Sequence, residues 1–157
     1  MEVGSAGFEP RLVVTDDDSR AELVKQLTHP GAERIWYLAD AFRAGFEMEE
    51  IYGYSGVDPW FLVQIQDIVR LEGMLEGRSV TDLEFAELRN LKRKGFADKR
   101  IAAVMGASEA SVRAHRQALN LRPVYKRVDT CAAEFSSATA YMYSTYEEEC
   151  EAAPSDR

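Results

Sequence analysis

Few side chains in this sequence combine the residue type and the spacing that chemistry requires. Asp16, Asp17 and Asp18 are consecutive, and three adjacent carboxylates cannot all face one cation without further ligands. They therefore indicate a solvated run before a helix. His29 and His115 have no partner at ligand spacing, and neither the P-loop pattern nor the GxGxxG pattern occurs. We predict that the chain carries no catalytic, cofactor-binding or metal-binding residue.

The two cysteines, Cys131 and Cys150, are predicted to be reduced and structural. Asp129 and Glu134 lie near Cys131 in the sequence, and neighbouring carboxylates raise the pKa of a thiol and make it a poorer nucleophile. The N-terminus has no basic stretch followed by an apolar one, as a secretory signal would. No apolar run approaches the ~20 residues that cross a bilayer. We therefore expect a cytoplasmic protein without a membrane partner.

Charge is distributed unevenly along the 157 residues. Residues 1–88 carry 7 Lys and Arg against 18 Asp and Glu, a net charge of -11, and residues 89–127 carry 11 against 2, a net charge of +9. Residues 128–157 carry 1 against 7, a net charge of -6, which brings the whole chain to -8. A basic middle between acidic ends is expected of a nucleic-acid-binding face, of a contact with an acidic surface, or of ordinary solvated helices.

The elements that would position these residues are predicted to be helices up to about residue 120. Asp58-Pro59 is the clearest start, because aspartate can cap a free backbone N–H and proline suits the first helical position. That helix has a wide apolar face that includes Phe61 and Ile65, and we predict it to be the most buried helix. The other predicted helices are one capped by Ser19, one from Arg34, one around Met48–Tyr54, one after a Thr81–Glu84 capping box, and two at Asp98–Met105 and Ser108–Asn120. The length and the 46% apolar composition predict one globular domain, and these helix signals predict that it is an all-α, irregular multi-helix domain.

Residues 96–119 are similar to a helix-turn-helix. The core of such a unit would be Ile101, Val104, Val112 and Leu119. Arg113, His115 and Arg116 would then lie on the second helix, in or near a DNA groove. Because any two short helices joined through a glycine turn can produce this pattern, a small nucleic-acid-binding protein is the alternative hypothesis.

Residues 123–157 predict an extended, mostly non-helical C-terminal arm, with strand-like composition at Tyr141–Tyr146. Its aromatic side chains include Tyr125, Phe135, Tyr141, Tyr143 and Tyr146. Such rings could stack on nucleic-acid bases. We predict instead that they pack on a neighbouring domain, where a ring can be buried while its hydroxyl finds a partner.

The stretch from Pro123 to Glu149, PVYKRVDTCAAEFSSATAYMYSTYEEE, resembles the segment that closes the oligomerization domain in the large subunit of carbamoyl phosphate synthetase. Three earlier segments are similar to the same domain and occur in the same order: RIWYLADAFRAG from Arg34, DPWFLVQIQDIVR from Asp58 and LKRKGFAD from Leu91. The resemblance extends from about Gly7 to Pro154.

The resemblance implies a scaffold role without catalysis in a fragment of that large subunit. Residues 1–18 would be a linker from one synthetase half, residues 19–122 a helical oligomerization domain, and residues 123–157 an arm leading to the second half. The implied partners are further copies of the chain and the two ATP-grasp halves, with no nucleic acid. The parent enzyme makes carbamoyl phosphate from bicarbonate, glutamine-derived ammonia and ATP for pyrimidine and arginine synthesis. Its ATP, its Mg or Mn and its K would bind outside this chain.

The first helix offers a candidate self-association surface. Leu23, Val24 and Leu27 form a narrow apolar stripe near the edge of the chain, and we predict that this stripe mediates association. The alternative is that the three side chains pack on the domain's own core.

Overall fold

The computed structural model describes residues 4–128 and 141–152. The helices are α1 (Asp17–Thr28), α2 (Arg34–Arg43), α3 (Met48–Ser55), α4 (Pro59–Leu75), the 3₁₀ turn η1 (Val80–Asp82), α5 (Phe85–Arg93), α6 (Asp98–Met105) and α7 (Glu109–Ala118). Two short strands follow, β1 (Val124–Arg127) and β2 (Met142–Thr145). The predicted fold class, a helical domain with a largely non-helical C-terminal arm, is confirmed.

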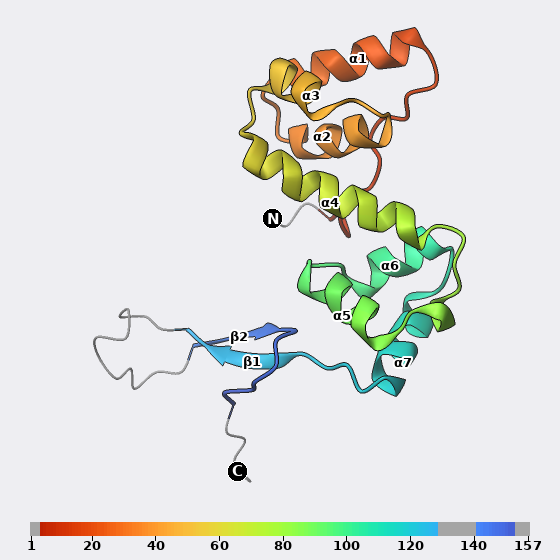
Figure 1. The fold of residues 1–157 in the computed structure, drawn as a ribbon, viewed down its shortest axis with the longest axis vertical. Helices are drawn as coiled ribbons and strands as arrows, with labels where there is room; N and C mark the ends of the chain where they lie inside the picture. Colours follow the sequence, from red (N-terminus) through yellow and green to blue (C-terminus); the bar gives the residue numbers. More distant parts are fainter. Residues whose placement is uncertain (1–3, 129–140, 153–157) are drawn as a thin grey trace.

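Helix α4 is the central element, because it packs against two separate hydrophobic cores. Figure 1 shows α1 to α3 on one side of α4 and α5 to α7 on the other. The N-terminal core contains Leu23, Leu27, Leu38, Ala39, Ala41, Phe46, Ile51, Leu62 and Ile65. The C-terminal core contains Leu71, Leu75, Val80, Leu83, Leu88, Leu91, Phe96, Ile101, Ala102, Val112 and Leu121. One continuous helix therefore holds the two cores in a fixed relation.

The predicted start of α4 is confirmed. The Asp58 carboxylate accepts a hydrogen bond of 2.8 Å from the Trp60 backbone N–H, and Pro59 is the first helical residue. The prediction that Phe61 belongs to the buried face was wrong, since its side chain is 56% exposed. Leu62 and Ile65 face the N-terminal core, and Phe61 is turned about 100° around the helix axis from Leu62.

Two other predicted helix starts were misplaced. Asp16, not Ser19, is the N-cap of α1: its side chain accepts from the Ser19 N–H at 2.8 Å, and Ser19 Oγ accepts from the Asp16 N–H at 3.1 Å. The predicted Thr81–Glu84 capping box is replaced by two boxes, Ser79 with Asp82 and Glu84 with Glu87. Of the three acidic residues at 16–18, Asp16 is thus the cap, and Asp17 and Asp18 lie in the first turn, where a carboxylate interacts favourably with the positive end of the helix dipole.

The C-terminal arm forms an antiparallel hairpin. Val124 pairs with Thr145 and Arg127 pairs with Met142, which confirms the predicted strand character of this segment. The hairpin extends away from the helices in Figure 1. In the described ranges, no helix has both the length and the apolar composition needed to span a bilayer.

Candidate functional site

A buried ion cluster joins the two cores. Glu72 of α4 is only 4% exposed. Its Oε2 accepts a hydrogen bond from Arg43 Nη2 of α2 at 2.7 Å, and its Oε1 accepts one from Arg100 Nε of α6 at 2.6 Å. A buried carboxylate is tolerated only when it is paired and hydrogen-bonded, and here each oxygen holds one guanidinium. We call Arg43, Glu72 and Arg100 the Glu72 cluster. It connects α2, which belongs to the N-terminal core, with α6, which belongs to the C-terminal core.

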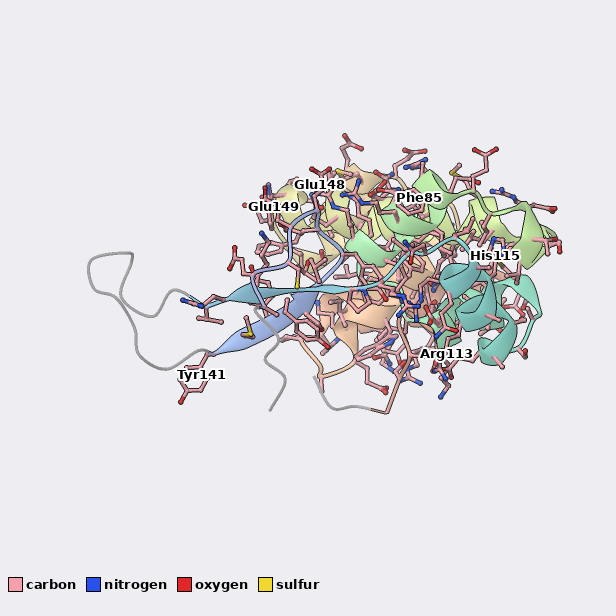
Figure 2. All side chains as sticks on the ribbon, turned by 90° about the horizontal axis from the view of Figure 1, so that it is seen from below. Phe85, Arg113, His115, Tyr141, Glu148 and Glu149 are labelled. Carbon is pink, nitrogen blue, oxygen red and sulfur yellow. The ribbon has the colours of Figure 1, made fainter. Side chains whose placement is uncertain are left out.

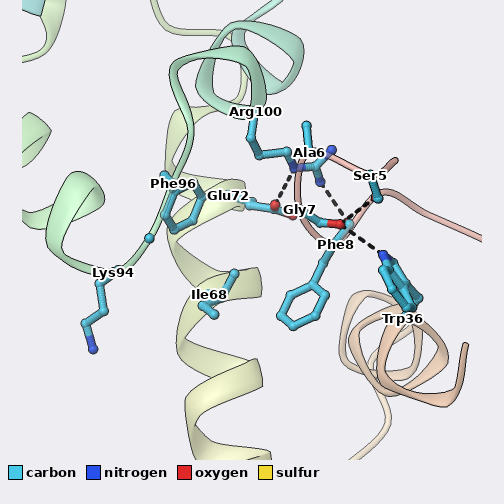
Figure 3. Close-up of a pocket in the computed structure, with 11 residues that line it drawn as sticks. Ser5, Ala6, Gly7, Phe8, Trp36, Ile68, Glu72, Lys94, Phe96 and Arg100 are labelled. Carbon is cyan, nitrogen blue, oxygen red and sulfur yellow. Dashed lines mark hydrogen bonds and ion pairs between the residues drawn. The ribbon is translucent and has the colours of Figure 1, made fainter. Parts of the chain in front are cut away.

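The Glu72 cluster also holds the N-terminal segment. Both of its arginines donate to the backbone carbonyl of Phe8, with Arg100 Nη2 at 2.9 Å. The indole N–H of Trp36 donates to the neighbouring Gly7 carbonyl at 2.9 Å, as drawn in Figure 3. A Cβ atom at Gly7 would lie 3.2 Å from Arg100 Cγ, so the glycine permits this close approach.

Asp40 secures the next residues of the same segment. Its Oδ2 accepts from the backbone N–H groups of Arg11 and Leu12, both at 2.9 Å, while its Oδ1 accepts from Arg43 Nη1 at 2.7 Å. Residues 7–12 are therefore a strap across both cores, although the sequence had assigned them to a linker. The Asp40–Arg43 spacing on one helix was a signal for a local pair, but nothing in the sequence connected that pair to Phe8.

The strap borders a small cavity. Its volume is about 230 Å³, and Figure 3 shows Phe8, Trp36, Ile68 and Phe96 around it, with Glu72 and Arg100 at one side. Of the polar side chains that line it, Glu72 and Arg100 are engaged with each other, Ser5 and Trp36 donate to the Gly7 carbonyl, and Lys94 pairs with Asp67.

A second buried ion cluster stabilises the C-terminal core. Asp98 accepts from Lys92 at 2.8 Å and from Arg116 Nη2 at 3.0 Å. Burial by itself would raise the pKa of Asp98, but the hydrogen bonds and charges of Lys92 and Arg116 outweigh it, so the pKa lies below its usual value. Asp98 is thus held as a carboxylate between two cations.

This cluster bears directly on the helix-turn-helix hypothesis. Helices α6 and α7 do pack against each other, but Arg116 is engaged with Asp98, and His115 Nε2 lies 2.8 Å from the Leu83 carbonyl. Arg113 is exposed and pairs with Glu109 on its own helix. Figure 2 labels Arg113 and His115 on α7. Two of the three predicted groove residues therefore have structural partners within the domain.

The basic middle of the chain meets an acidic segment of the same chain. Arg89 lies 3.2 Å from Glu148, and Lys126 lies 3.2 Å from Glu151 and 4.0 Å from Glu149. Figure 2 shows Glu148 and Glu149 on the segment that returns from the hairpin. The carboxylates of these pairs are exposed, so each pair contributes only ~0–1 kcal/mol, but together they place negative charge on the basic surface. The uneven charge of the sequence is thus partly balanced within the molecule.

The predicted arm contacts divide into two groups. Tyr146 is half-buried against the C-terminal core, with Lys92 Nζ 5.2 Å from its ring centroid, and burial raises the pKa of its hydroxyl. Tyr125, Tyr141 and Tyr143 are exposed on the hairpin, and Figure 2 shows Tyr141 at its outer end. Phe135 lies outside the described residues.

The predicted self-association stripe is not on the surface. Leu23 and Leu27 have no exposed area and belong to the N-terminal core, and Val24 is half-buried against the same core. The physical reason is that α2 and α3 both pack against α1 and cover its apolar side. The placement agrees with the alternative, in which this stripe packs on the domain's own core.

Two adjacent aromatic side chains are exposed at the start of α4. Trp60 and Phe61 are 65% and 56% exposed, and their rings meet edge to face with centroids 4.9 Å apart. Beside them is a hollow of about 560 Å³ whose other walls include Arg34, Leu38 and Val57. The sequence contained this signal, because two aromatic residues directly follow the helix cap, but the helical period alone had assigned Phe61 to the core.

Conventional reactive groups are sparse in the described ranges. No group of three or more His, Cys, Asp or Glu side chains there is arranged to hold a metal ion. Cys150 is exposed, and Cys131 lies outside the described residues.

Comparisons with known proteins agree on one family. The model of the carbamoyl-phosphate synthetase large chain, oligomerisation domain, matches residues 1–120. Over 157 residues the chain is 57% identical to the carbamoyl phosphate synthase large chain of Haemophilus ducreyi and 55% identical to that of Neisseria meningitidis serogroup B. It is 53% identical to that of Pseudomonas syringae pv. tomato. All of the chain is covered in each case, and it spans 14% or 15% of the length of these relatives.

Proposed function

Because the chain belongs to the family of oligomerisation domains of carbamoyl phosphate synthetase large chains, we propose that it acts as a scaffold within such a large chain. In this role it connects the two ATP-grasp halves, mediates self-association and performs no catalysis of its own. The parent enzyme would make carbamoyl phosphate from bicarbonate, glutamine-derived ammonia and ATP. ATP, Mg or Mn, and K would bind to the halves.

The single observation that best supports the scaffold role is the Glu72 cluster. A connector between two catalytic bodies must keep its own ends in a fixed relation. Here one carboxylate links α2 to α6, and the same two arginines hold the Phe8 carbonyl. A strap fixed to both cores would transmit the position of an attached body to the whole domain, instead of isolating it as a flexible linker would.

The engagement of the buried charged groups also supports a structural role. A general acid or base must reach the proton that it transfers. Glu72 and Asp98 are buried and each contacts two cationic side chains, so their oxygens are occupied by structural partners. Such groups stabilise the domain.

Sedimentation velocity of the chain from micromolar to millimolar concentration tests the association part of the proposal. We expect a concentration-dependent larger species that persists at moderate salt, because apolar association does not depend on counterion release. A species that instead disappears steeply as salt rises would indicate an electrostatic contact. A monomer throughout would contradict self-association through this chain.

A chimaera tests the connecting part. In the Haemophilus ducreyi large chain, the segment matching this chain would be replaced by the present sequence, with and without Glu72→Gln. We expect the unmodified chimaera to retain synthesis of carbamoyl phosphate. The Glu72→Gln chimaera should lose overall synthesis more than the ATPase activity of either half. Equal loss of all activities would contradict a connecting role.

A further inference from the structure

The segment that returns from the hairpin, residues 146–151, makes contacts of two different kinds. Its first residue, Tyr146, is half-buried against the C-terminal core. The residues that follow are exposed and mostly acidic, and Figure 2 shows Glu148 and Glu149 among them. The strands themselves extend away from the helices in Figure 1. We call residues 146–151 the latch, because they bring the far end of the arm back to the helices.

Tyr146 lies on the two cations that hold Asp98. Lys92 Nζ is 5.2 Å and Arg116 Cζ is 5.9 Å from the centroid of its ring. A cation within about 6 Å of an aromatic ring is attracted to its face. Both cations are already fixed by Asp98, at 2.8 Å and 3.0 Å, so the ring meets a surface that needs no further ordering. The Asp98 cluster is thus a preformed seat for one side chain of the arm.

The acidic part of the latch lies over the basic end of α5. Glu148 pairs with Arg89 of α5 at 3.2 Å, and Arg93 of the same helix lines one hollow together with Glu147, Glu148 and Glu149. The Glu148 side chain is 83% exposed, so this contact is weak and screened by salt. The contact of Tyr146 is shielded from solvent and depends much less on salt.

We propose that the latch is a releasable contact that sets the direction of the arm, with Tyr146 docked on the Asp98 cluster and the acidic residues after it docked on α5. Leu121, which is 4% exposed in the C-terminal core, fixes the point where the chain enters the hairpin. One fixed point leaves a hairpin free to swing, whereas two define its direction, and Tyr146 is the second. This device holds whether or not the chain associates with itself.

The small number of contacts makes the latch reversible. One half-buried ring and an exposed ion pair hold it to the helices, so a docked and a released state differ little in free energy and small perturbations shift their populations. Within the hairpin, Glu151 accepts from the Arg127 N–H at 2.7 Å and pairs with Lys126, so the strands can stay together when the latch is released. Release uncovers Arg89 and Arg93 and frees the arm to take another direction.

The experiment measures docking in the full 157-residue chain by nuclear magnetic resonance, with a paramagnetic label on the exposed Cys150 and with Cys131→Ser. Cys150 is two residues from Glu148, so a docked latch brings the label close to Arg89 and broadens the backbone amide signals of α5. Signals of α1, on the other side of α4 in Figure 1, are the internal reference. Mixing labelled chain with isotope-enriched unlabelled chain separates broadening between copies from broadening within one copy.

We expect Tyr146→Ala to lower the ratio of docked to released chain by about tenfold or more, and Tyr146→Phe to keep most of it because the ring remains. Tyr143→Ala is the matched control, since that tyrosine is 50% exposed on β2, and it should leave α5 broadened. High salt should lower the ratio by a smaller factor. Glu148→Gln should do the same and should reduce the remaining effect of salt. Thermal melts of each variant check that the fold is retained.

Three results would overturn the inference. Equal broadening of α5 in wild type and in a folded Tyr146→Ala chain would show that Tyr146 does not hold the arm. Broadening that changes neither with salt nor with Glu148→Gln would remove the acidic part of the latch. A Tyr146→Ala chain that fails to fold would show that the ring belongs to the core and is not releasable. None of the three bears on self-association, which sedimentation tests separately.

Discussion

Arg100 and Glu72 form a buried pair between α6 and α4, with Nε 2.6 Å from Oε1 and both side chains less than one-tenth exposed. The pair lies where the two cores and the N-terminal strap meet. Its removal should therefore affect more of the domain than an ordinary ion pair would.

We expect Glu72→Gln to lower the free energy of unfolding by about 3–5 kcal/mol, because it leaves the buried Arg100 without its carboxylate and the half-buried Arg43 with Asp40 alone. Urea titration measures the change. The control is Glu87→Gln, which breaks the more exposed pair with Arg78 and should cost at most ~1 kcal/mol. Similar losses in the two variants would show that the Glu72 cluster has no special structural role.

Asp98 should make stability depend on acidity. Its pKa is lowered in the folded state, so the unfolded chain binds a proton more readily in this range. The stabilisation is then present above the unfolded pKa of about 4 and is lost as pH falls through the folded value. Urea titrations between neutral and strongly acidic pH should show the stability gap between wild type and Asp98→Asn narrowing in acid. A gap independent of pH would contradict the assignment.

Gly7→Ala should destabilise the strap. The added Cβ would lie 3.2 Å and 3.3 Å from Arg100 Cγ and Cδ, and that side chain is held by Glu72 and the Phe8 carbonyl. We expect a loss of about 1–3 kcal/mol, typical of overpacking. Gly31→Ala is the matched control, because its Cβ would meet nothing within 4 Å, and it should be neutral or slightly stabilising. Thermal melts of both variants provide the comparison.

Leu23→Ala should act on stability and leave association unchanged. The side chain has no exposed area, so its truncation should cost about 2–5 kcal/mol through lost burial and a cavity. Sedimentation under native conditions should give the same dissociation constant as wild type. If the folded variant instead had a larger dissociation constant than wild type, the result would indicate that α1 is part of the association surface.

Local chemistry explains which elements the sequence could predict. Asp58-Pro59 is unambiguous because both residues favour a helix start through their own backbone and side chain. Residues 79–87 contain several pairs with the spacing of a capping box. The two boxes that form are those that leave Val80 and Leu83 packed in the core. By residue type alone, Ser19 would suit an N-cap as well as Asp16 does. In the structure Asp16 is the cap, and the helix begins three residues before the position that Ser19 predicts.

Contacts between distant parts of the chain could not be predicted in the same way. The apolar stripe at Leu23 looks the same whether it is covered by α2 and α3 or by another molecule, and only the fold decides. The Glu72 cluster joins residues from three helices and holds the backbone carbonyl of Phe8, and a backbone carbonyl has no sequence signature. Conversely, the apolar face of α4 is wider than the part that the other helices cover at its start. Phe61 lies on the uncovered part and is therefore exposed.

The strap has a consequence for the order in which the domain is made. Phe8 is synthesised 92 residues before Arg100, the side chain that fixes it to α6. The N-terminal core uses residues only up to 69 and can close while the rest of the chain is still on the ribosome. The strap can thus be held first by Trp36, Asp40 and Arg43 and only later by Arg100. We expect a nascent chain halted before α6 to keep a folded N-terminal core whose leading segment is more open to proteolysis than in the complete domain.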